Sequence, residues 1–147
     1  MIRILGILLA SVFAVLGLFH LYWAAGGRFG GSAAVPTTGG ERLFNPSPLG
    51  TVLVAVALFA AMLVVLGRIN LLGSSLPKWI FRWATFALGA LFLMRAIGDF
   101  KYVGFFKSIS QTDFARLDSL LFTPLCLLIA IAAFLISYNE PGATKNS

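Results

Sequence analysis

The sequence predicts an all-α membrane protein, a bundle of four transmembrane helices. Of its 147 residues, 59% are hydrophobic and only 11% are charged, whereas a typical soluble domain has about 25% charged residues. The mean hydropathy is +0.95. Four apolar stretches of about 20 residues nearly fill the chain, and each is long enough to cross a hydrocarbon core about 30 Å thick. We therefore expect a single transmembrane domain over residues 1–147.

The first predicted helix covers about residues 4–25, and the glycine-rich residues 26–31 end it. Its apolar run is longer than the roughly 7 to 15 residues of a signal-peptide core. The run ends in Tyr22 and Trp23, and such aromatic residues are typical of a membrane interface. We therefore expect a retained helix, not a cleaved signal peptide.

The second helix, about 49–67, has no charged or strongly polar side chain and is predicted to be scaffold. Ala57 and Ala61 give it a small-residue face for close helix packing. The third helix, about 79–98, follows Pro77, which suits the start of a helix.

The fourth helix is predicted over about 119–138, with Asp118 or Ser119 as its cap. Pro124 lies in its first turns. An earlier start near Thr112, followed by a kink, is therefore the alternative.

The net charge is +6, but the lysines and arginines are scattered singly near helix ends. They indicate membrane anchors and topology signals, not a nucleic-acid site. The short second connection collects Arg68, Lys78 and Arg82, so we expect a multi-pass protein of the cell membrane with cytoplasmic termini. Residues 139–147 are predicted to form a short disordered tail. The expected partners are membrane lipids and either a second copy or another membrane protein.

No metal or other cofactor is predicted. His20 is the only histidine, and a transition-metal site needs several ligands. The single cysteine, Cys126, excludes an intramolecular disulfide. Covalent catalysis has no support because no nucleophile motif of the Gly-x-Ser-x-Gly kind occurs.

One side of the membrane collects the polar residues, because helices 1 and 3 end there and helix 4 begins there. The candidate catalytic residues are His20, Asp99 and Asp118, and the candidate ligand-binding residues are Trp23, Arg95, Tyr102, Asp113 and Arg116.

Each candidate has two interpretations. Arg95 and Asp99 are four residues apart, which predicts an ion pair, either structural or functional. His20 is either a proton carrier tuned by a carboxylate or a buried histidine bonded to a backbone carbonyl. Asp118 is either a helix cap or a catalytic acid. Asp113 and Arg116 are spaced for an ion pair within the segment before helix 4.

Two stretches resemble a known family. The first is His20-Leu-Tyr-Trp23-Ala-Ala-Gly-Gly27, continuing to Pro36; the second contains Arg95-Ala-Ile-Gly-Asp99 and Phe114-Ala-Arg-Leu-Asp118. They are similar to small bacterial four-helix membrane proteins grouped under a domain of unknown function. The resemblance implies the fold and a membrane location, and it brings no activity.

Three functions fit the sequence to different degrees. The first hypothesis is an accessory protein that binds a lipid or other amphiphile at the polar interface, because arginine suits phosphate and carboxylate groups. The alternative is an intramembrane enzyme that does acid–base chemistry on a hydrophobic substrate. A proton-coupled transporter is disfavoured, because carriers place ionisable groups near the bilayer midplane.

Overall fold

A computed structural model describes residues 1–30, 35–38, 41–43, 45–73 and 76–139. The helices are α1 (Ile2–Ala24), α2 (Pro48–Arg68), α3 (Lys78–Ile97) and a continuous run of α4 (Asp113–Leu117), the π-helix η1 (Asp118–Phe122) and α5 (Thr123–Tyr138). Two short strands, β1 (Thr37–Thr38) and β2 (Glu41–Arg42), pair antiparallel. Among the described residues, four helical spans are long and apolar enough to cross a membrane, which confirms the predicted fold class. The predicted disordered tail lies outside the described residues from residue 140 on.

The fourth spanning helix begins earlier than residue 119. The Thr112 hydroxyl caps it by accepting a hydrogen bond from the Ala115 N–H at 3.1 Å, so Asp118 is not the N-cap. The π-helix turn ends at Phe122, two residues before Pro124. A proline removes one backbone donor and crowds the carbonyl four residues before it, here that of Leu120. The wider π turn accommodates this defect.

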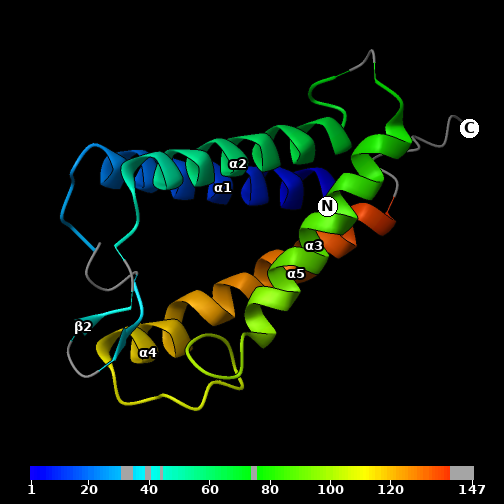
Figure 1. Ribbon diagram of the computed structural model, residues 1–147. Helices are drawn as coiled ribbons and strands as arrows, with labels where there is room; N and C mark the ends of the chain where they lie inside the picture. Colours follow the sequence, from blue (N-terminus) through cyan, green and yellow to red (C-terminus); the bar gives the residue numbers. More distant parts are fainter. Residues whose placement is uncertain (31–34, 39–40, 44, 74–75, 140–147) are drawn as a thin grey trace, which may run out of the picture.

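The helices form two closely packed pairs, α1 with α2 and α3 with α5 (Figure 1). Glycines allow the close approach within each pair. A methyl group added at Gly17 would lie 2.9 Å from the Phe59 ring, and one at Gly89 would lie 2.9 Å from the Phe134 ring. Of the predicted small face of α2, Ala61 is buried whereas Ala57 is exposed.

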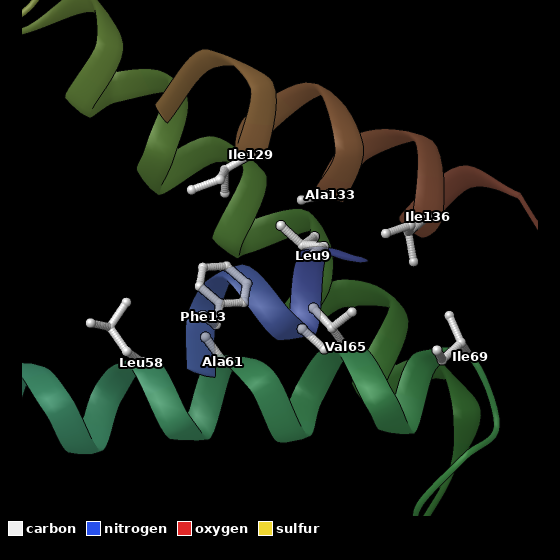
Figure 2. Packing of buried hydrophobic residues seen from close by; sticks show 10 residues of the cluster. Leu9, Phe13, Leu58, Ala61, Val65, Ile69, Ile129, Ala133 and Ile136 are labelled. Carbon is white, nitrogen blue, oxygen red and sulfur yellow. The ribbon is translucent and has the colours of Figure 1, made fainter. Parts of the chain in front are cut away.

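The apolar core lies where α1, α2 and α5 meet, as Figure 2 shows. Its buried members are Leu9, Ala10, Phe13, Leu58, Ala61, Val65, Ile69, Ile129, Ala133 and Ile136. The two pairs converge near the N-terminus and splay apart toward the end that carries β2 and α4 (Figure 1). Burial follows this shape. In α1, all of whose residues are described, no residue after Gly17 is buried. In α2, which is also fully described, no residue before Ala55 is buried. The half of the α1–α2 pair near the N-terminus is therefore packed, and its other half is open, whereas α4 and η1 at that end bury Phe114 and Asp118.

Arg68 closes the packed half. Its side chain is 3% exposed and donates hydrogen bonds to the carbonyls of Ser137 at 3.1 Å and Asn139 at 2.9 Å. A cation at the carbonyl end of a helix stabilises that end. The sequence suggested an interfacial anchor, but Arg68 instead connects the end of α2 to the end of α5.

Candidate functional site

The connection from α3 to α4 is organised around Asp99. One oxygen of this carboxylate, Oδ1, accepts hydrogen bonds from the backbone N–H groups of Lys101 at 3.0 Å, Tyr102 at 2.7 Å and Val103 at 3.0 Å. These bonds lower the pKa of Asp99, with the Val103 N–H contributing most; partial burial opposes them. Asp99 therefore holds the backbone of a tight turn.

Two glycines let this turn fold back onto the end of α3. Gly98 and Gly104 have φ angles of +92° and +87°, which favour glycine. A methyl group at Gly98 would overlap the Val103 carbonyl, and one at Gly104 would overlap the Ile97 carbonyl. The Phe105 N–H then bonds to the Ala96 carbonyl at 2.9 Å. The returning chain lies directly against the last turn of α3.

Asp118 lies at the centre of the site and is 0% exposed. Its Oδ1 accepts a hydrogen bond from Arg95 Nη2 at 2.7 Å. Its Oδ2 accepts from the Gly104 N–H at 2.9 Å, from Lys107 Nζ at 3.1 Å and from the Thr123 hydroxyl at 3.0 Å. Asp118 thus joins α3, the α3–α4 connection and α5. We call Arg95, Lys107 and Asp118 the charged cluster.

The predicted ion pair between Arg95 and Asp99 is wrong. The spacing of four residues requires a continuing helix, but α3 ends at Ile97 and the positive φ of Gly98 turns Asp99 away. The partner of Arg95 is instead Asp118 at 2.7 Å, 23 residues further along the chain.

Sequence reasoning missed three partners of Asp118: Gly104, Lys107 and Thr123. Lys107 is 5% exposed, and it also donates to the Gly104 carbonyl and the Ser119 hydroxyl. The one available signal was a carboxylate at the start of an apolar helix, since a buried charge requires partners. The residues that supply them depend on the loop and on the π turn, and neither follows a simple periodicity.

The charged cluster is not electrically balanced, because two cations share one carboxylate. Arg95 is the accessible residue of the charged cluster. Its side chain is 33% exposed, whereas the side chains of Lys107 and Asp118 are buried. The Nη1 atom of Arg95 is covered by protein and makes no hydrogen bond within the described residues. A buried donor without a partner costs about 1–3 kcal/mol. The guanidinium therefore retains both charge and unused donors.

His20 and Trp23 belong to the end of α1. The Nδ1 atom of His20 lies 2.8 Å from the Leu16 carbonyl oxygen, and its ring is 5.1 Å from the Trp23 ring, edge to face. Trp23 Nε1 donates to the Phe29 carbonyl at 2.8 Å. Gly26, with φ +91°, ends the helix. The ring of His20 thus lies against a backbone carbonyl, and among the described residues no hydrogen bond joins it to a carboxylate.

The other candidates lie at the surface of this end. Asp113 and Arg116 are exposed, and no ion pair connects them in the part of the chain that is described. The half-buried Tyr102 contributes its N–H to Asp99, and Lys101 Nζ lies 5.1 Å from the centre of its ring. Of the eight predicted site residues, Arg95 and Asp118 share a direct side-chain bond. Within the described residues, no group of three histidine, cysteine or acidic side chains is placed to hold a metal ion.

The chain is similar to a known protein family. A family model described as "Protein of unknown function (DUF3995)" matches residues 13–133. No curated protein and no solved structure matches the chain.

Proposed function

Because the chain belongs to this family of unknown function, we propose its role from its own geometry: it is an integral membrane protein that binds an anionic amphiphile, with the head group at Arg95. The observation that carries the proposal is the exposure of the Arg95 guanidinium together with its unused hydrogen-bond donors. Arg95 is the exposed part of a cluster with surplus positive charge, and it has donors that no described residue uses. An anionic oxygen could approach the exposed part of the side chain, and it would reach the covered Nη1 donor if the guanidinium reoriented.

The flank of α3 below Arg95 suits a hydrocarbon chain. Leu91 lies four residues before Arg95 and therefore on the same face of the helix, one turn closer to the membrane interior. Its side chain is 55% exposed, and the neighbouring Met94 is 62% exposed. A ligand with an anionic head and an apolar chain matches this order of charge and hydrocarbon. Membrane lipids have this chemistry.

Binding fits the charged cluster better than acid–base catalysis. A general base must be within reach of the substrate, but Asp118 is 0% exposed and both of its oxygens already accept hydrogen bonds from protein donors. Asp99 binds three backbone N–H groups through Oδ1, and these bonds lower its pKa and so weaken it as a base. Neither carboxylate has a described hydrogen bond to His20.

The proposal is tested by lipid retention. The protein is purified in mild detergent and titrated with phosphatidylglycerol, and bound lipid is counted by native mass spectrometry. Phosphatidylcholine with the same acyl chains is the zwitterionic comparison. Arg95→Gln keeps a donor for Asp118 but removes the charge. A hydrogen bond to a charged group contributes about 1.5–3 kcal/mol, so we expect phosphatidylglycerol affinity to fall about tenfold or more.

The matched control is Arg28→Gln, which removes the same charge from an exposed position after α1. It is expected to retain phosphatidylglycerol like the wild type. Equal retention by Arg95→Gln would refute the head-group assignment. Equal affinity for phosphatidylcholine would refute the anionic requirement.

We further propose that the protein resides in the cell membrane with its termini in the cytoplasm. The connection between α2 and α3 lies on the side of the termini, and the exposed Lys78 and Arg82 follow it at the start of α3. Such charges favour a cytoplasmic position. A reporter fused after residue 147 that is active only in the cytoplasm tests this orientation. Activity of a reporter that works only outside the cytoplasm would reverse it.

A further inference from the structure

Three phenylalanines of the α3–α4 connection point away from the protein. Phe100, Phe105 and Phe106 are 63%, 55% and 64% exposed, and the rings of Phe100 and Phe106 are 6.1 Å apart. Phe100 also has a φ of +62°, which costs a residue with a side chain about 1–2 kcal/mol. Burying these rings in the protein would be the ordinary outcome in water. The structure instead keeps them outside.

The connection is placed at the depth of the membrane boundary. Phe105 donates its N–H to the carbonyl of Ala96, inside the last turn of α3, and Gly104 contacts the backbone of Ile97. The apolar span of α3 continues to Ile97, and Met94 and Ile97 in that last turn are exposed apolar residues. Phe105 and Phe106 thus return to the level at which the span ends. In a bilayer spanned by α3, that level would be the boundary between lipid and water.

We propose that the segment from Phe100 to Phe106 is an interfacial anchor, whose phenylalanine rings enter the boundary between lipid head groups and acyl chains. Lys101 is exposed within the same segment, and a cation beside exposed apolar rings is typical of segments that lie in a membrane interface. The partner is the bilayer itself. The anchor is independent of any amphiphile bound at Arg95, so it extends the proposed function without resting on it.

Depth-dependent fluorescence quenching tests the anchor. In a Cys126→Ala background, a single cysteine replaces Phe106 and is labelled with bimane. The protein is reconstituted in vesicles of phosphatidylcholine and phosphatidylglycerol. The matched control places the same label at Ser110, an exposed polar residue of the same connection. Acyl chains that carry a nitroxide near the head group report lipid contact, and iodide reports water.

We expect the lipid nitroxide to quench the label at position 106 at least twofold more strongly than the label at 110. Iodide should give the opposite order. Equal iodide quenching at both positions would overturn the anchor, because the segment would lie in water. Protection of position 106 from both quenchers would also overturn it, because a second protein copy would then cover the rings. Adding Arg95→Gln should leave the pattern unchanged, which separates this result from the lipid-binding test.

Discussion

Replacing Asp118 by asparagine should destabilise the protein strongly. Asp118 is 0% exposed and is bonded to Arg95 and Lys107. The change keeps the shape of the side chain but leaves two cations without their shared carboxylate. Breaking a buried ion pair by removing one partner costs about 3–5 kcal/mol. Because Arg95 is one-third exposed, water screens part of this loss, and we expect about 3 kcal/mol.

The free energy of unfolding is measured by titrating the detergent-solubilised protein with sodium dodecyl sulfate and following helix content and tryptophan fluorescence. Asp113→Asn is the matched control, since it removes the same charge from an exposed position of the same helical run. It should change the unfolding free energy by less than about 0.5 kcal/mol. In the double variant with Arg95→Gln, the two losses should not add, because both remove one interaction. A loss below about 0.5 kcal/mol for Asp118→Asn would refute the central role of this carboxylate.

Three further predictions follow from the loop and from the end of α2. Gly104→Ala should speed proteolysis of the α3–α4 connection far more than Gly26→Ala does. Both glycines have φ near +90°. Open space surrounds Gly26, whereas a side chain at Gly104 would meet backbone atoms. Equal effects would contradict this packing. Arg68→Met should lower the unfolding free energy by about 2 kcal/mol, since hydrogen bonds from a charged donor to two carbonyls are lost. Arg68→Lys should recover part of this loss. An unchanged unfolding curve for Arg68→Met would exclude a stabilising link between α2 and α5. The pKa of Asp99 is lower in the folded protein than in the unfolded chain, where it is about 4. The ionised carboxylate therefore stabilises the α3–α4 connection fully above pH about 4. This stabilisation is lost as the pH falls through the pKa of the folded protein. Pepsin cleavage of the α3–α4 connection should therefore rise over that acidic range. The Asp99→Asn variant should be cleaved readily at every pH in the range. The same pH profile in both proteins would contradict stabilisation of the connection by the Asp99 carboxylate.

The spanning helices could be predicted from the sequence because lipid imposes a simple requirement. Each span must be long, apolar and internally hydrogen-bonded, so the bounds of α1, α2 and α3 follow from hydropathy and from the flanking glycines and prolines. The gathering of polar residues at one end followed from connectivity alone. Neither result required knowledge of side-chain contacts.

The pairing inside the site could not be predicted in the same way. Helical spacing favoured Asp99 as the partner of Arg95, but one glycine with positive φ ended the helix between them. Lys107 reaches Asp118 through a loop that folds back, and Thr123 reaches it across a π turn. These contacts depend on backbone geometry that no periodic pattern encodes. The prediction of an interfacial Arg68 failed for a similar reason. Its carbonyl partners are about 70 residues away along the chain, so no local pattern indicates them.

The position of Arg68 has a consequence for biosynthesis. The carbonyls that it binds, at the end of α5, belong to the last span and are synthesised after the other three. These two hydrogen bonds can therefore form only once α5 has been made and has packed into the bundle. Arg68 thus joins the second span to the last one through a contact that no shorter piece of the chain can make.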